Sequence, residues 1–106
     1  YHKDQKKPFL YPSIKKRIEF NKKSKIFIKN ANCIRDFLNA EKLINIIYRI
    51  YKKKLTGVYN IGSGKGTTVK KFLEKELKLK KRIITNNHVN RIVCNNYKLK
   101  YKLNEK

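Results

Sequence analysis

Apolar residues recur along the chain with helical spacing in two long segments. Across residues 40–54 they fall three and four positions apart and so share one face of an amphipathic helix (Leu43, Ile44, Ile47, Ile50 and Tyr51). A second helix is predicted from Thr67 or Thr68, whose hydroxyl would cap it, to about Lys80. Four apolar residues face inward on this helix (Val69, Phe72, Leu73 and Leu77).

Shorter apolar runs, rich in β-branched residues, predict strands between these helices. They are Lys25–Lys29, Cys33–Leu38, Gly57–Gly62, Arg82–Thr85 and Arg91–Cys94. Short helices are expected over Ser13–Phe20 and Asn95–Leu103, and residues 1–12, which hold both prolines, are expected to form a loop. The order helix–strand–strand–helix–strand–helix–strand–strand–helix indicates an α/β fold, or α+β as an isolated piece.

The composition adds a large positive charge to this pattern. The 106 residues include 29 Lys and Arg against 7 Asp and Glu, a net charge of +22, and Lys far outnumbers Arg. Two interpretations stay open: lysines spread over solvated faces with weak, salt-sensitive affinity for polyanions, or a small basic nucleic-acid-binding module. In the second, Lys-rich helices would contact phosphates while exposed tyrosines stack on bases (Tyr48, Tyr51, Tyr97 and Tyr101).

The hydropathy and the two cysteines indicate where the protein is located and whether it binds a metal. No apolar run approaches the roughly 20 residues of a membrane span, so we expect no membrane partner. A Lys-rich chain without a visible leader is typical of a cytoplasmic protein, in which Cys33 and Cys94 stay free thiols. They lie far apart without a zinc-binding spacing, so no metal site is predicted.

A glycine-rich turn follows the predicted strand at Gly57–Gly62. A phosphate-binding P-loop would need Lys where Ser63 stands, and a dinucleotide fingerprint would need Gly where Thr67 stands. We therefore interpret it as a tight strand-to-helix turn, with anion binding at Gly62, Ser63 and Gly64 left open because a helix follows. The spacing Tyr-x-x-x-Lys occurs twice, no more than chance allows in so Lys-rich a chain.

An ordered phrase then joins several of these elements. Asn-Cys-Ile-Arg-Asp-Phe-Leu at residues 32–38 precedes an amphipathic helix, Gly-Val-Tyr-Asn-Ile-Gly-Ser-Gly at 57–64, and a Thr-capped helix. This phrase resembles the C-terminal half of the NAD-dependent epimerase/dehydratase family, extended short-chain dehydrogenase/reductases that act on nucleotide-sugars. Residues 91–98 are similar to the family's closing Arg-x-x-x-Asp-x-Ser-Lys. The likeness spans about residues 25–103.

The resemblance implies the C-terminal portion of an extended Rossmann-type fold, divided into a loop and short helix at 1–24 and an incomplete substrate-binding segment at 25–106. Arg35 and Arg91 take the places of arginines that contact the nucleotide and its diphosphate, and we expect them to converge on a cleft. The half that binds NAD and supplies the catalytic Tyr and Lys is absent. We therefore expect no catalytic residue and no cofactor in this chain alone, and its partners to be a nucleotide-diphosphate sugar and the missing half or a second copy.

Three departures from the family pattern qualify this expectation. The family's helix-opening Asp falls on Lys42, and its later Asp and Ser fall on Asn95 and Tyr97, so substrate contact there is in doubt. Asn39 can replace the lost cap one turn earlier. Without a partner, the chain is expected to expose apolar strand and helix faces and to be marginally stable.

Overall fold

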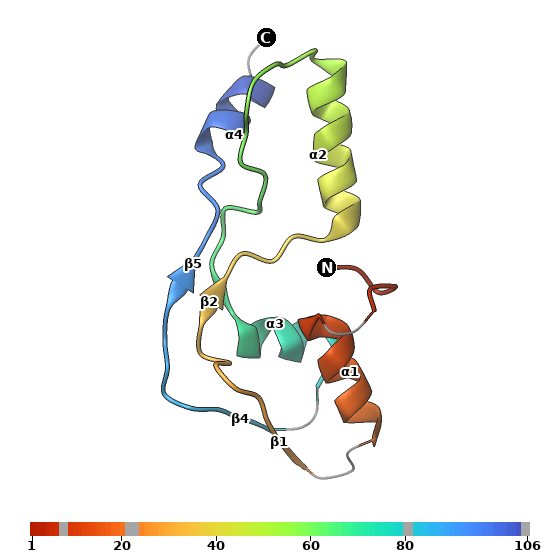
Figure 1. Cartoon of the computed structure of the whole chain (residues 1–106), viewed down its shortest axis with the longest axis vertical. Helices are drawn as coiled ribbons and strands as arrows, with labels where there is room; N and C mark the ends of the chain where they lie inside the picture. The colour runs from red at the N-terminus through yellow and green to blue at the C-terminus, as the bar shows by residue number, and fades with distance from the viewer. Residues whose placement is uncertain (7–8, 21–23, 80–81, 105–106) are drawn as a thin grey trace.

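The computed structural model describes residues 1–6, 9–20, 24–79 and 82–104. Helices and strands succeed one another in the expected order of types, although the fifth element lies in a different segment from the one predicted (Figure 1). Four helices and five short strands occur in the described residues: α1 (Leu10–Phe20), β1 (Lys25–Phe27), β2 (Ile34–Arg35), α2 (Ala40–Lys52), β3 (Thr67–Thr68), α3 (Val69–Glu76), β4 (Arg82–Ile84), β5 (Arg91–Ile92) and α4 (Tyr97–Asn104). The chain is therefore a mixed α/β structure with small sheets.

The lower part of the molecule, here called the body, comprises the described residues of 1–39 and 67–94. Its strands β1 and β4 pair in parallel with Ile26 opposite Ile83, and both side chains are buried while their strand neighbours face solvent. Helices α1 and α3 pack against this pair (Figure 1). The body's core contains Ile14, Ile26, Ile28, Ala31, Val69, Phe72, Leu73 and Ile83.

Aromatic rings extend this core toward the N-terminus. The ring of Phe72 stacks on Phe37 at 3.8 Å between centroids and meets the edge of Tyr1 at 4.7 Å. The terminal ammonium of Tyr1 donates to the Leu38 carbonyl at 2.8 Å, and the Tyr1 carbonyl accepts from the Ala40 N–H. These bonds hold the first residue of the chain beside the start of α2.

A three-stranded sheet in the order β3–β2–β5 lies above this core. Strand β2 runs antiparallel to β3 and parallel to β5, with Ile34 opposite Thr68 and Arg91, and Arg35 opposite Thr67 and Ile92. The strands have only two residues each, so the sheet mainly aligns the segments that leave the body.

The upper part, here called the arm, comprises residues 40–66 and 95–104. It contains α2, α4 and the segment that connects α2 to the glycine turn (Figure 1). The predicted cap is confirmed, because the Asn39 side chain accepts from the Glu41 N–H at 2.8 Å. Thr68 likewise caps α3 by accepting from the Lys71 N–H. Among the described residues, no helix is both long and apolar enough to cross a membrane.

The strand predicted at Gly57–Gly62 is wrong, because these residues form irregular backbone. A strand requires a neighbour that satisfies its N–H and C=O groups, and no described strand pairs with this segment. Val58 within it is 83% exposed. The fifth element in the chain is instead β3, at Thr67–Thr68.

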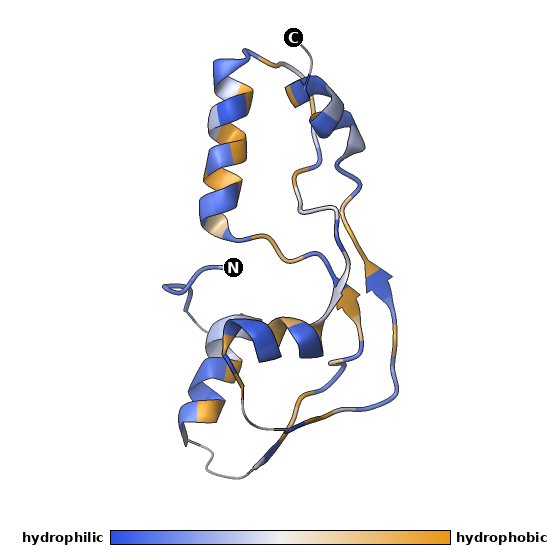
Figure 2. Ribbon diagram, turned by 180° about the vertical axis from the view of Figure 1, so that it is seen from behind, coloured by the Kyte–Doolittle hydropathy of each residue, from blue (hydrophilic) through white to orange (hydrophobic). Residues whose placement is uncertain are grey.

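Helix α2 forms where the sequence predicts it, but its predicted inward face is not covered. No residue of α2 is buried, and Ile44, Ile47 and Tyr51 are 62%, 49% and 75% exposed. Hydrophobic and hydrophilic residues alternate along the helix in the hydropathy view (Figure 2). This agrees with the expectation that an isolated chain exposes apolar helix faces.

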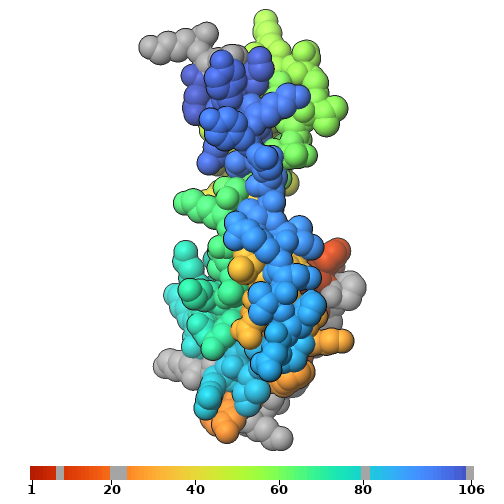
Figure 3. Space-filling model, turned by 90° about the vertical axis from the view of Figure 1, so that its left-hand side faces the viewer, coloured from red at the N-terminus to blue at the C-terminus, as the bar shows by residue number. Residues whose placement is uncertain are grey.

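The molecule is elongated and has more accessible surface than a compact domain of its size. The radius of gyration is 16.6 Å and the extents are 53 × 28 × 21 Å, whereas a compact domain of this length has a radius of gyration of about 13 Å. The accessible surface is 8324 Å², against roughly 6,200 Å² for a compact protein of this mass. The space-filling view shows a narrow waist between arm and body (Figure 3).

Candidate functional site

Three segments cross the waist, and the carboxylate of Asp36 on one of them accepts hydrogen bonds from the other two. Asp36 itself lies on the first crossing. Its Oδ1 accepts from the Ser63 N–H at 2.8 Å and the Ser63 hydroxyl at 2.6 Å, and its Oδ2 accepts from the Gly64 N–H at 2.9 Å. Its Oδ2 also accepts from the Cys94 N–H, on the third crossing, at 3.2 Å. We call this arrangement the Asp36 clasp.

The clasp determines the charge state of its own carboxyl group. Partial burial opposes ionisation, but four hydrogen bonds from Ser63, Gly64 and Cys94 favour the carboxylate and lower the pKa of Asp36 below its ordinary value. The same negative charge acts on Cys94: burial and the neighbouring Asp36 raise the pKa of its thiol. Asp36 is therefore ionised at neutral pH, and Cys94 is a protonated thiol.

Glycine is required at two positions of the turn, at Gly62 by close approach of other atoms and at Gly64 by its backbone conformation. A Cβ on Gly62 would overlap the Cys94 side chain and lie 3.0 Å from Asp36 Oδ2, so the clasp closes only over a glycine. Gly64 has φ of +74°, in the left-handed region that glycine adopts without strain. Asn96 completes the enclosure by donating from Nδ2 to the Gly62 carbonyl at 2.9 Å.

The predicted anion-binding turn thus holds an anion that belongs to the protein itself. The N–H groups of Ser63 and Gly64 point at Asp36, and so they are not directed at an external phosphate. A turn of this kind attracts negative charge because consecutive N–H groups converge on one point. The sequence identifies the turn, while the identity of its occupant depends on tertiary structure.

Arg35 and Arg91, the two predicted substrate-binding residues, lie on neighbouring strands but are not brought together. Arg91 is in register with Ile34, so the alternation of side chains places Arg35 and Arg91 on opposite faces of the sheet. Arg35 Nη1 donates to the Ile34 carbonyl and to Asn90 Oδ1. Among the described residues, no ion pair joins Arg35 to Asp36 or Glu41.

Arg91 lies beside a polar hollow next to the glycine turn. Its guanidinium passes so close to Gly66 that a Cβ there would stand 2.9 Å from Nη1. The hollow has a volume of about 420 Å³ and is lined by Gly64, Arg91, Val93, Cys94, Asn95, Asn96 and Tyr97. It combines one guanidinium, two amide side chains and one aromatic ring that is 78% exposed.

Two asparagines in this region were missed by the sequence analysis. Asn90 orients Arg35, and Asn96 closes the turn. Asparagine is so frequent in this chain that neither position stood out. Their only sequence signal is their proximity to Arg91 and to the end of β5.

The other titratable candidates are the two cysteines and the two histidines. Cys33 is buried and Cys94 half-buried, and both are free thiols, as expected. His2 lies 3.5 Å from Glu41 and 3.6 Å from Asp4, while His88 is exposed. In the part of the chain that the structure describes, no group of three or more His, Cys, Asp or Glu residues could hold a metal ion.

Comparison with known proteins links part of the chain to epimerases. UDP-arabinose 4-epimerase 1 of Arabidopsis thaliana is 33% identical over 48 residues, which cover 42% of this chain and 12% of that protein. A second Arabidopsis thaliana protein named for the same 4-epimerase activity is 35% identical over 48 residues, or 42% of this chain and 11% of its own length. No family model matches, and no solved structure matches. The matched segment thus spans about an eighth of these relatives, and the chain is similar there to proteins named as UDP-arabinose 4-epimerases.

Proposed function

We propose that this chain is the nucleotide-sugar-binding C-terminal segment of an NAD-dependent epimerase or dehydratase, and that it is not catalytic alone. The similarity to two UDP-arabinose 4-epimerases is the observation that carries this proposal. The phrase Arg-Asp-Phe, helix, Tyr-Asn-Ile-Gly-x-Gly supports it from the sequence. In this proposal the fold is the C-terminal portion of an extended Rossmann-type enzyme.

Arg91 is the residue we assign to the diphosphate of the nucleotide-sugar. A guanidinium pairs with phosphate oxygens through charge-assisted hydrogen bonds, and Arg91 lines a hollow with Asn95, Asn96 and Tyr97. Amide side chains suit the hydroxyls of a sugar, and an exposed ring suits a base. Arg35 is a second candidate from the opposite sheet face, with Nη1 already bonded to Asn90.

NAD would be held by the other half of such an enzyme. The glycine turn of this chain does not fit the pyrophosphate of a dinucleotide, because the Ser63 and Gly64 N–H groups donate to Asp36. In the proposal, the part this chain's residues contribute is binding and orienting the sugar-nucleotide.

The uncovered apolar face of α2 supports a protein partner for this segment. Ile44, Ile47, Tyr48 and Tyr51 are exposed on one side of the helix, and Val58 is exposed nearby in sequence. Together with the surplus surface, this face is what a second folded unit would cover. The cofactor-binding half of the enzyme is the partner that we propose.

Binding of UDP to the chain tests the assignment of Arg91. We expect UDP to bind the wild-type chain measurably in isothermal titration calorimetry, and Arg91→Gln to weaken it roughly tenfold through loss of a charge-assisted pair. Arg82→Gln removes the same charge from an exposed position on β4 and should leave binding unchanged. Equal losses in the two variants, or no UDP binding at all, would contradict the assignment.

A second candidate function has one specific observation in its favour. The four tyrosines considered for base stacking are all exposed, by 58% at Tyr48, 75% at Tyr51, 78% at Tyr97 and 62% at Tyr101. Tyr97 and Tyr101 lie four residues apart on α4 beside Lys100. Fluorescence anisotropy with single-stranded RNA separates the functions: a nucleic-acid module requires that Tyr97→Ala/Tyr101→Ala weaken RNA binding by tenfold or more.

A further inference from the structure

A second hollow lies between α2 and α4, and Arg91 is not among its lining residues. It has a volume of about 430 Å³, within the size range of small-molecule sites. One wall is the side of α2 that carries Lys42, Asn45, Ile46 and Arg49, which are spaced i, i+3, i+4 and i+7. The opposite wall has the same spacing and consists of Asn96, just before α4, and of Leu99, Lys100 and Leu103 on α4.

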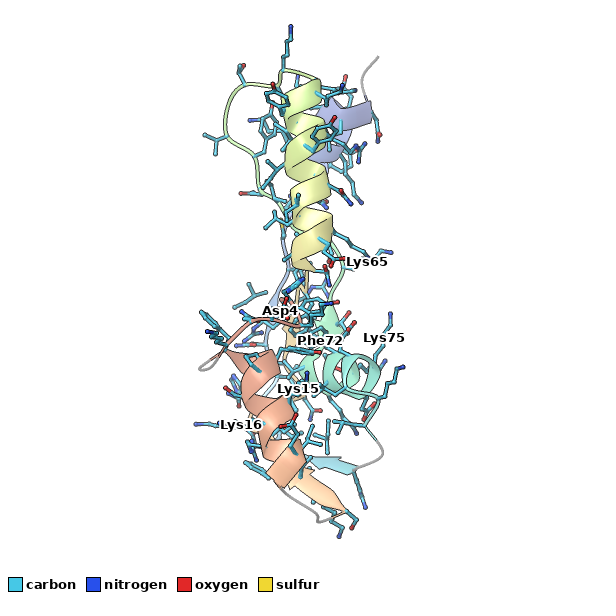
Figure 4. All side chains as sticks on the ribbon, turned by 90° about the vertical axis from the view of Figure 1, so that its right-hand side faces the viewer. Asp4, Lys15, Lys16, Lys65, Phe72 and Lys75 are labelled. Carbon is cyan, nitrogen blue, oxygen red and sulfur yellow. The ribbon has the colours of Figure 1, made fainter. Side chains whose placement is uncertain are left out.

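Four cationic side chains line this hollow, and the ionised Asp36 lies beside it, bonded to the lining residue Ser63. Lys42, Arg49, Lys65 and Lys100 line it, and no acidic residue does so. Their cationic ends form no hydrogen bond or ion pair with other described residues. Within the described arm, Glu41 is the acidic residue, and its carboxylate lies 3.5 Å from His2. Lys65 projects from the waist at the height of the lower end of α2 (Figure 4).

The interior of the hollow is aliphatic. Leu38 and Ile46 are half-buried, and Leu99 and Leu103 are buried with 3% and 8% exposure. No aromatic ring lines it, so it offers no stacking surface for a base. Asn45 adds an amide that has no hydrogen-bond partner among the described side chains. The lining therefore combines an aliphatic interior with several cations.

This hollow does not compete with the uncovered apolar face of α2. At 100° per residue, Lys42, Asn45 and Arg49 point about half a turn away from Ile44, Ile47 and Tyr51. A partner protein could therefore cover the apolar face while the hollow stays open to a ligand on the other side.

We infer that the hollow between α2 and α4 binds an anionic aliphatic molecule, a small amphiphile with a phosphate or carboxylate head group. The head group pairs with Lys42 and Arg49, and the aliphatic part lies against Ile46, Leu99 and Leu103. The inference uses none of the residues assigned to the nucleotide-sugar except the shared wall at Asn96, and it stands without the proposed function.

The test uses decyl phosphate below its micelle concentration, with decanol and inorganic phosphate as the separate halves of the probe, at about 150 mM salt. We expect decyl phosphate to bind at least tenfold more tightly than either half. In methyl NMR of the wild-type chain, it should shift Ile46, Leu99 and Leu103 before the body's Ile14 and Leu73. Because this measurement needs no variant, it decides the question even if a variant fails to fold.

A matched pair of double variants separates the site from general charge. Lys42→Gln/Arg49→Gln should weaken decyl phosphate binding about tenfold or more. Lys15→Gln/Lys16→Gln removes the same two charges from exposed positions on α1 in the body (Figure 4) and should change it less than twofold. Arg91→Gln should also leave it unchanged, which distinguishes a failure here from a failure of the UDP assignment.

Several results would overturn the inference. Equal weakening by the two double variants would mean non-specific attraction to a chain of charge +22. Decanol binding as tightly as decyl phosphate would remove the role of the cations. Binding only to phosphatidic acid vesicles, and not to soluble decyl phosphate, would indicate a membrane-surface contact instead of a ligand in this hollow.

Discussion

The body and the arm have similar shares of apolar residues, but the body buries many of them and the arm exposes most of them. Of the eleven buried apolar residues in the described chain, nine lie in the body and two, Leu99 and Leu103, lie in the arm. Seven of the large apolar residues that are exposed lie in the arm, although the arm is the smaller part (Ile44, Ile47, Tyr48, Tyr51, Val58, Tyr97 and Tyr101). The body encloses a core, and the arm presents apolar surface outward.

The difference shows that a strong helical pattern indicates a buried face without identifying what buries it. Helix α3 packs Val69, Phe72 and Leu73 against α1 and the β1–β4 pair of the same chain. Helix α2 has an equally regular pattern and a satisfied cap, yet none of its residues is buried. Secondary structure in the arm is thus determined locally, because its apolar helix face gains no burial within the described chain.

The largest expected effect is the loss of a core side chain in the body. Leu73 is fully buried beside Phe72 and Ile83, so Leu73→Ala leaves a cavity and should lower the free energy of unfolding by about 2–5 kcal/mol. Because we expect the chain to be marginally stable, this change should abolish the cooperative urea transition monitored by circular dichroism. A wild-type-like transition in this variant would contradict the assignment of the core to the body.

Breaking the Asp36 clasp should have the next largest effect, because it joins the two regions. Asp36→Asn removes the charge and one acceptor, so the N–H groups of Ser63, Gly64 and Cys94 keep only a weaker partner. This should lower the free energy of unfolding by about 2 kcal/mol. Amide hydrogen exchange at Ser63 and Gly64 should accelerate while exchange at Leu73 changes less. Asp4→Asn, at an exposed carboxylate near the N-terminus, is the matched control.

Acid should release the same clasp. Because the pKa of folded Asp36 lies below its unfolded value of about 3.9, the unfolded chain binds more protons between the two values. The stabilisation by Asp36 is therefore complete above pH about 4 and is lost as pH falls through the folded pKa. Urea midpoints between pH 3 and 6 should show this fall in the wild type, and a shallower fall in Asp36→Asn.

The smallest effect is expected on the uncovered face of the arm. Ile44 is 62% exposed, so Ile44→Ser should change the free energy of unfolding by less than about 0.5 kcal/mol in the isolated chain. If a partner covers this face, the same variant should weaken association much more than folding. A large loss of stability in the isolated chain would mean that α2 is already packed, contrary to the structure.

Local signals made much of this fold predictable. The existence of the four helices, the caps at Asn39 and Thr68 and the inward residues of α3 all follow from periodicity and side-chain chemistry within a few positions. The irregular backbone at Val58–Ile61 could not be predicted in this way, because a β-rich run becomes a strand only when another strand satisfies its backbone hydrogen bonds.

The candidate site was less predictable, because it depends on register and on long-range hydrogen bonds. The sequence identified Arg35, Arg91 and the glycine turn as notable, yet a pairing in which Ile34 faces Arg91 separates the two guanidinium groups. A shift of one residue would have placed them on the same face. The role of Asp36 spans 27 and 58 residues of sequence, a separation that no local pattern reveals.

The clasp has a mechanical consequence. The carboxylate of Asp36, on one of the three connections between arm and body, accepts hydrogen bonds from the other two, so it restrains rotation of the arm about the waist. The Tyr1 carbonyl adds a second restraint, because it accepts from the Ala40 N–H at the start of α2. Opening the clasp should therefore loosen the arm without releasing it from the body.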